Sequence, residues 1–136
     1  MNTHKCSDGS RVTQRQINSK LSRARKDCTE AYICQCYGAP KRVMDCDHTI
    51  SQRRCKELGK TELIWDENNW SWSSREAHIE WEEYKSGKFQ HHLNFKQRMA
   101  YMAEHDYTGF MARFHYVTNA DLIAWCESVM FPDDED

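Results

Sequence analysis

The residues best suited to chemistry in this chain are an adjacent acid and histidine, an asparagine and a second histidine: Asp47, His48, Asn69 and His78. His78 lies nine residues after Asn69. A neutral histidine can act as a general base near pH 7. A carboxylate and a second imidazole can hold one divalent ion, and these ligand types suit Mg²⁺, Mn²⁺, Ni²⁺ and Zn²⁺ to different degrees. A base and a Lewis acid together are what hydrolysis of a phosphodiester requires.

The sequence around these residues resembles the HNH endonucleases of the ββα-metal (His-Me finger) class, in the form of small phage-type members. The resemblance rests on three pieces of sequence: Asp47-His48, Trp65-Asp66-Glu67-Asn68-Asn69-Trp70, and Asn69-Trp70-Ser71-Trp72-Ser73-Ser74-Arg75-Glu76-Ala77-His78. It covers roughly residues 32–86. It implies an α+β fold in which a ββα-metal finger core carries additional flanking α-helices.

The resemblance also implies a role for each residue of the motif. His48 would be the general base, and Asn69 would hold the loop that bears His48. Asp47 and His78 would be the metal ligands, with the two side chains of Asp47 and His48 pointing in opposite directions from a strand end. In an alternative alignment Asn69 itself is the third-position ligand, because it lies 22 residues after Asp47. The expected cofactor is one divalent ion, Mg²⁺ or Mn²⁺ before Ni²⁺ or Zn²⁺.

The cysteines depart from the family pattern. Many members hold a structural zinc with two Cys-x2-Cys pairs, but here Ser74 and Ala77 stand where the downstream pair would be. The upstream pair would be Cys34 and Cys36, which is one residue tighter than usual. A structural zinc would have to recruit further cysteines from elsewhere: Cys28, Cys46 or Cys55. We therefore expect no structural zinc and buried free thiols instead, as in a chain that stays in a reducing compartment.

Length and composition are those of one ordinary folded domain. The chain has 136 residues, of which 39% are hydrophobic and 29% charged. It has no apolar run near the ~20 residues that cross a bilayer, and its start lacks the apolar segment of a secretion signal. We expect a cytoplasmic protein without a membrane partner, located in the host cell if a phage encodes it.

Charge is distributed unevenly along the chain. Residues 1–60 hold 13 Lys and Arg against 6 Asp and Glu, and residues 61–136 hold 6 against 15. A basic half suits a polyanion, because neutralising phosphates supplies most non-specific affinity for nucleic acid. A two-sided surface with internal ion pairs is the alternative. The candidate DNA-binding side chains are Arg15, Lys20, Arg23, Arg53, Arg54, Lys56 and Lys60.

The expected elements follow from capping and periodicity. Thr13 and Gln16 have the spacing of a capping box and predict a helix over residues 13–26. Amphipathic spacing predicts further helices over residues 71–86, 95–105 and 119–130, the last capped by Asn119. Met99, Met102, Phe110 and Phe114 are expected in the core. The segments expected to be strands are 31–34 and 42–44, and those expected to be irregular are 1–12, 37–40, 51–60, the surface turn His91-His92 and the acidic tail 133–136.

These observations predict one domain with an N-terminal basic arm and helix (1–30), an HNH core (31–87), C-terminal helices (88–131) and an acidic tail (132–136). The expected activity is nicking or cutting of duplex DNA by a monomer or a homodimer. Two alternatives remain: a non-catalytic DNA-binding or packaging accessory protein on an HNH-like scaffold, and a nuclease directed at RNA.

Overall fold

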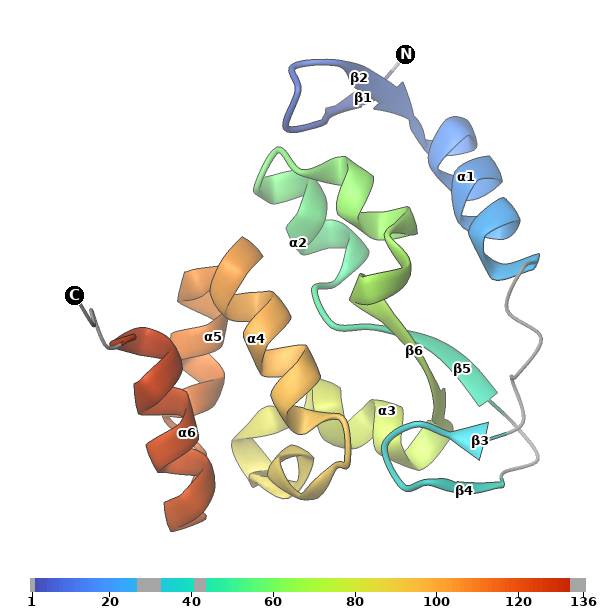
Figure 1. Ribbon diagram of the computed structural model, residues 1–136. Helices are drawn as coiled ribbons and strands as arrows, with labels where there is room; N and C mark the ends of the chain where they lie inside the picture. Colours follow the sequence, from blue (N-terminus) through green and yellow to red (C-terminus); the bar gives the residue numbers. More distant parts are fainter. Residues whose placement is uncertain (1, 27–32, 41–43, 133–136) are drawn as a thin grey trace.

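The computed structural model describes residues 2–26, 33–40 and 44–132, and every structural statement here refers to these ranges. Within them the chain forms three antiparallel sheets of two strands each and six α-helices joined by 3₁₀ turns (Figure 1). The expected α+β class is confirmed. No helix in the described ranges combines the length and the apolar character needed to cross a membrane.

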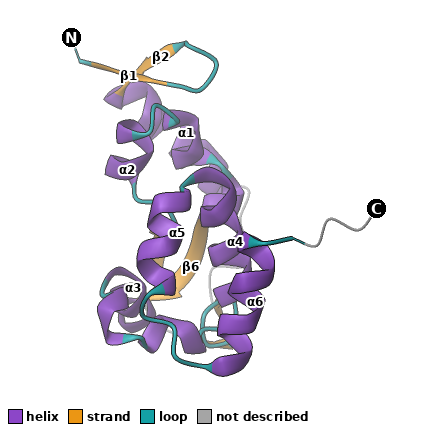
Figure 2. Ribbon diagram, turned by 90° about the vertical axis from the view of Figure 1, so that its left-hand side faces the viewer, coloured by secondary structure: helices purple, strands orange, loops and turns teal. Residues whose placement is uncertain are grey.

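The N-terminal residues form a hairpin rather than the irregular arm that the sequence predicted. Strands β1 (Thr3–Lys5) and β2 (Arg11–Thr13) pair antiparallel. The turn between them closes where Cys6 N donates to Ser10 O at 2.8 Å, with Gly9 at a positive φ of 89°. The prediction failed because so short a hairpin has only three residues a strand and almost no alternating pattern. Figures 1 and 2 both place this hairpin at one end of the molecule, beside α1.

Helix α1 (Gln14–Lys26) begins with the capping box that the sequence predicted. Thr13 Oγ1 accepts from Gln16 N at 3.2 Å, and Gln16 Oε1 accepts from Thr13 N at 2.8 Å. Ile17 and Leu21 are buried, in the same core cluster as Leu63 and Ile64 of the 3₁₀ helix Thr61–Trp65. The apolar side of α1 therefore faces the core, and four of its basic side chains are exposed: Arg15, Lys20, Arg23 and Arg25.

The centre of the molecule is the hairpin of β5 (Met44–His48) and β6 (Trp70–Ser74), followed directly by α3 (Arg75–Glu82). In the register of this hairpin Asp47 is opposite Ser71 and His48 opposite Trp70. The prediction of a helix from residue 71 is wrong for its first turn. Trp-Ser-Trp-Ser alternates with a period of two, as a strand requires, and the helix starts only after Ser74 caps Ala77 N at 3.3 Å.

The connection from β5 to β6 contains α2 (Gln52–Glu57), where the sequence analysis expected an irregular loop. Ser51 Oγ caps this helix by accepting from Arg54 N at 3.1 Å, and Cys55 is buried beneath it. Of the basic residues that suggested a loop, Arg53 is exposed on this helix, whereas Arg54 and Lys56 are partly buried. Two 3₁₀ turns, Thr61–Trp65 and Glu67–Asn69, complete the connection.

A third hairpin, β3 (Ile33–Cys34) with β4 (Ala39–Pro40), lies against the far end of β6. The turn of this hairpin, Gln35–Gly38, agrees only in part with the turn expected at residues 37–40. Of the two strand segments predicted in this region, residues 31–32 and 42–43 lie outside the described ranges. The acidic tail 133–136 and Cys28 lie outside them as well.

Three helices follow: α4 (Phe95–His105), α5 (Tyr107–Phe114) and α6 (Ala120–Met130). Helices α4 and α6 are confirmed, and Asn119 caps α6 by accepting from Asp121 N at 2.9 Å. Helix α5 was missed, because it is only eight residues long and contains Gly109. Of the four side chains expected in the core, Phe114 is partly buried and three are buried: Met99, Met102 and Phe110. The prediction of a surface turn at His91-His92 is wrong for His92, which is buried.

Candidate functional site

The motif residues Asp47 and His48 end strand β5, and strand alternation sends their side chains in opposite directions. Asp47 is completely buried and faces α3 and α4. His48 is partly buried, and its ring faces the 3₁₀ helix on the other side. One strand end thus presents a carboxylate to one side and an imidazole to the other.

The imidazole of His48 is oriented by a backbone carbonyl. Its Nε2 lies 2.9 Å from Ile64 O. A carbonyl oxygen only accepts, so Nε2 carries the hydrogen and Nδ1 keeps a lone pair in the neutral ring. Burial lowers the pKa of His48 below its usual value, and the charges of Arg25 and Arg98 act in the same direction. The neutral form, which can accept a proton at Nδ1, is therefore favoured at neutral pH.

Asn69 holds the loop that follows His48. Its Oδ1 accepts from Ile50 N at 2.7 Å, and its Nδ2 donates to Ile50 O and Leu63 O, each at 3.0 Å. Its own carbonyl accepts from Thr49 N at 2.6 Å. These are hydrogen bonds of the kind that the sequence analysis expected from Asn69. Because the amide is buried and committed to this loop, His78 is the better candidate for the third-position ligand.

His78 reaches toward β5 from α3. Its Nδ1 lies 3.1 Å from Asp45 Oδ2, and its Nε2 lies 2.9 Å from Glu82 Oε1 and 3.6 Å from Asp47 Oδ1. Burial, the largest influence, lowers the pKa of His78, but the hydrogen bond to Asp45 and the surrounding carboxylates raise it overall. The hydrogen bond to Asp45 orients the ring, as around many metal-binding histidines, while Nε2 is paired with the partly exposed Glu82 and would have to exchange that carboxylate for an ion to act as a ligand.

Asp47 Oδ1 and His78 Nε2 are the atoms that fit a divalent ion. Asp47 Oδ1 is buried and has no hydrogen-bond partner, and 3.6 Å to His78 Nε2 is too long for a hydrogen bond. No group of three or more His, Cys, Asp or Glu side chains that could hold a metal ion by itself occurs in the described ranges. Two protein ligands suit Mg²⁺, which keeps several waters and binds substrate phosphate.

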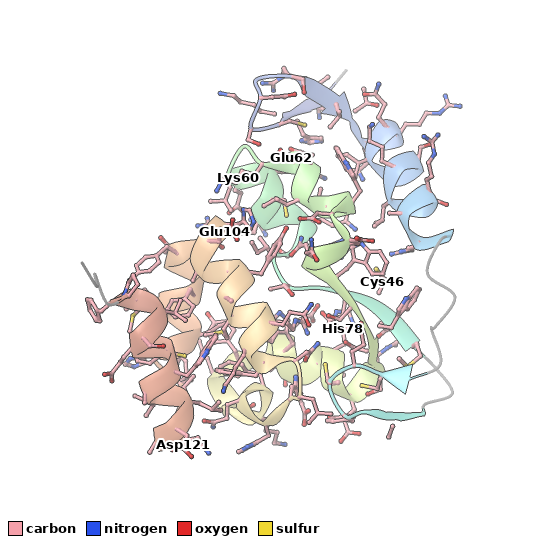
Figure 3. All side chains as sticks on the ribbon, viewed as in Figure 1. Cys46, Lys60, Glu62, His78, Glu104 and Asp121 are labelled. Carbon is pink, nitrogen blue, oxygen red and sulfur yellow. The ribbon has the colours of Figure 1, made fainter. Side chains whose placement is uncertain are left out.

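Two clefts meet beside these residues, in the part of the molecule where Figure 3 labels Cys46 and His78. One, of about 370 Å³, is lined by residues that include His48 and Arg54. The other, of about 540 Å³, is lined by residues that include Arg25 and Arg75. The side chains that line both clefts are Cys46, His78 and Glu82. A substrate can thus approach the site between α1, α2 and α3.

The seven cations expected to contact DNA divide into two groups. Three of them are half-buried and bound within the protein: Arg54 to Asp106, Lys56 to Gln14, and Lys60 to His105 O. The others are exposed: Arg15, Lys20, Arg23 and Arg53. Lys20 also lies 5.2 Å from the centre of the Trp65 ring. The exposed group, on α1 and the outer face of α2, is the one available to phosphates.

Three residues of this site were missed by the sequence analysis: Asp45, Glu82 and Arg98. Asp45 was not among the candidate site residues, yet it orients His78. Alternation along β5 places it on the face of Asp47, which is a signal that the sequence contained. Glu82 follows His78 by four residues on one helix face, also a readable spacing. Arg98 had no such signal, since it contacts Asp47 across 51 residues.

Five of the described cysteines are buried, as expected: Cys6, Cys34, Cys36, Cys55 and Cys126. Cys34 and Cys36 are buried against the serines that end β6, with Cys34 Sγ 3.7 Å from Ser74 Oγ and Cys36 Sγ 3.4 Å from Ser73 Oγ. Ala77 belongs to the same small cluster. Ser74 and Ala77, which stand at the expected positions of the second cysteine pair, thus pack a hydroxyl and a methyl group against these thiols.

Comparisons of the chain with protein-family models, with curated proteins and with solved structures found no match.

Proposed function

We propose that this chain is a metal-dependent endonuclease that hydrolyses phosphodiester bonds in duplex DNA, with β5, β6 and α3 as a ββα-metal finger core. One observation carries the proposal. The adjacent residues Asp47 and His48 flank a strand end, so that a neutral imidazole lies on one side and an uncommitted carboxylate oxygen, 3.6 Å from His78 Nε2, on the other. Hydrolysis of a phosphodiester needs this combination of base and ligands.

In the proposed reaction His48 accepts the proton of the attacking water at Nδ1. The water oxygen forms a bond to phosphorus while the bond from phosphorus to the 3′ oxygen breaks. The hydrogen bond from Nε2 to Ile64 O keeps the ring in place as it gains charge. Asn69 keeps the following loop fixed during this step.

Asp47 Oδ1 and His78 Nε2 would hold the divalent ion, and Asp45 would keep the His78 ring turned toward it. When bound there, the ion would neutralise charge on the phosphate and the departing oxygen. The exposed cations of α1 and α2 bind the DNA backbone on the side of the clefts, which makes the affinity dependent on salt. Because each chain has one such site, a monomer would cut one strand at a time, and a double-strand cut would require a homodimer or two successive nicks.

A plasmid relaxation assay in Mg²⁺ and in Mn²⁺ tests the proposal. We expect His48→Ala to lower the nicking rate at least ~10²-fold, the usual contribution of a general base. His91→Ala, at an exposed histidine outside the motif, is the matched control and should nick like the wild type. A His48→Ala protein that relaxes plasmid as fast as the wild type contradicts the proposal.

A non-catalytic DNA-binding or packaging protein is the second candidate, and one observation favours it. Asp47 is buried against Arg98, and a purely structural ion pair has the same appearance. This candidate predicts salt-sensitive retention of DNA without strand scission in any divalent metal. Competition between DNA and RNA substrates in the same assay distinguishes these two DNA-directed functions from a nuclease that acts on RNA.

A further inference from the structure

The two carboxylate oxygens of Asp47 have different surroundings. Oδ2 accepts a hydrogen bond from Arg98 Nη1 at 2.9 Å. Oδ1 has no hydrogen-bond partner and lies 3.6 Å from His78 Nε2. The carboxylate is therefore turned so that one oxygen is bound by a cation and the other is directed at the histidine of α3.

Arg98 has little freedom to release that oxygen. Its side chain is 2% exposed, and its Nε donates to Thr49 Oγ1 at 2.9 Å. Its guanidinium carbon lies 3.9 Å from the centre of the Trp81 ring, which is the distance of a cation–π contact. Trp81 Nε1 in turn donates to Thr49 O at 3.2 Å. Helix α4, the loop after β5 and helix α3 thus fix the guanidinium from three directions.

We propose that Arg98 is a positioning residue for Asp47: it binds Oδ2, so that the carboxylate offers only Oδ1 to a divalent ion shared with His78. This inference rests on the proposed function. It gives the C-terminal helices a role, because α4 supplies the cation that orients a ligand on β5. It also implies weak binding of the ion in the absence of DNA, since the nearby guanidinium repels a cation and a single oxygen binds less strongly than two.

The inference predicts that metal affinity and cleavage move in opposite directions when Arg98 is replaced. In Arg98→Met the repulsion is gone and both oxygens of Asp47 are free, so we expect Mn²⁺ to bind at least ~10-fold more tightly in titration calorimetry without DNA. The ion is then no longer held in one position, and we expect plasmid nicking to fall at least ~10-fold. A merely structural role for Arg98 would weaken both quantities together.

Arg113→Met is the matched control. Arg113 also lies 3.9 Å from the Trp81 ring centre and is buried, but its hydrogen bond goes to Trp81 O and not to Asp47. We expect a smaller change in Mn²⁺ affinity than in Arg98→Met. If both variants change the affinity by the same factor, Arg98 acts through packing or general charge, and the positioning role is refuted.

Arg98→Lys keeps the test decisive if Arg98→Met does not fold, as judged by circular dichroism and thermal unfolding. Lysine retains the charge but has one nitrogen for the two acceptors Asp47 and Thr49. We expect Mn²⁺ affinity within ~3-fold of wild type and nicking reduced at least ~10-fold. Undiminished nicking by Arg98→Lys refutes the role. A wild-type protein that neither binds Mn²⁺ nor nicks DNA refutes the proposed function itself, which is a separate outcome.

Discussion

The two ends of the β5–β6 hairpin carry polar clusters that differ in one respect. At the end of the hairpin that carries Asp47, here called the open end, Asp47 Oδ1 is buried without a hydrogen-bond partner and faces His78. At the other end, Cys34 Sγ and Cys36 Sγ are each paired with a serine hydroxyl, and Ser74 N donates to Cys34 Sγ at 3.4 Å. Residues of ligand type are present at both ends, but among the described cysteine, serine and carboxylate groups of these two clusters only Asp47 has a buried side-chain atom without a hydrogen-bond partner. The comparison indicates that uncommitted atoms, rather than residue types, distinguish a candidate site from a packed cluster.

The largest effect is expected from His78, because its removal takes away a proposed ligand at the open end. We expect His78→Ala to weaken Mn²⁺ binding by more than ~100-fold, beyond the range seen for outer partners of metal ligands. The nicking rate should fall together with the Mn²⁺ affinity, and excess metal should restore part of the rate. Titration calorimetry with Mn²⁺ measures the affinity, and the plasmid assay at increasing Mn²⁺ concentration measures the rate. Unchanged metal affinity would place the ion elsewhere and remove the contrast between the two ends.

A smaller effect is expected from Asp45, which contacts His78 but not the proposed ion. Asp45→Asn should weaken Mn²⁺ binding by about 10–100-fold, because the ring loses the charge that orients it and makes it a stronger ligand. Arg75→Met is the control: Arg75 Nε also lies on Asp45 Oδ2, at 2.9 Å, and its side chain is 69% exposed. Equal losses in the two variants would mean that the Arg75–Asp45 pair, and not the orientation of His78, is what matters.

The smallest effect is expected at the closed end of the hairpin, where Cys34 and Cys36 are paired with serines. Cys34→Ser should leave nicking and Mn²⁺ affinity unchanged and lower the free energy of unfolding by less than about 1.5 kcal/mol, the scale of one hydrogen bond. Chemical denaturation measures the stability, and the plasmid assay measures the rate. A large loss of Mn²⁺ affinity in Cys34→Ser would show that the two ends are coupled and that the comparison drawn above is wrong.

The sequence predicted those elements that are determined by residues within one segment of the chain. The capping box of α1, the Asn119 cap of α6 and the amphipathic spacing of α1, α4 and α6 lie within single segments, and so does the nine-residue step from Asn69 to His78. The same reasoning misplaced the start of α3, because Trp72 fits both a helical and an alternating pattern. It also treated the buried His92 as part of a surface turn, since the hydrogen bond of its Nε2 to Glu80 at 2.9 Å forms only in the folded chain.

Arg98 marks the limit of that reasoning. Its partners are Asp47 and Thr49 of the β5 strand and loop and Trp81 of α3, which lie on segments distant from α4 in the sequence. Arg98 lies outside residues 32–86, which the family resemblance covers, so the resemblance implied no site residue on the C-terminal helices. Folding brings the guanidinium to the one carboxylate that the motif singled out, and no spacing rule connects the two.

The most direct test is a crystal structure of the protein soaked with Mn²⁺, located by its anomalous scattering. We expect one ion within about 2.0–2.2 Å of both Asp47 Oδ1 and His78 Nε2, with Asp47 Oδ2 still bound to Arg98. The central claim is contradicted if crystals of a nicking-competent protein bind Mn²⁺ elsewhere, or if these two atoms hold no ion at a concentration that saturates nicking.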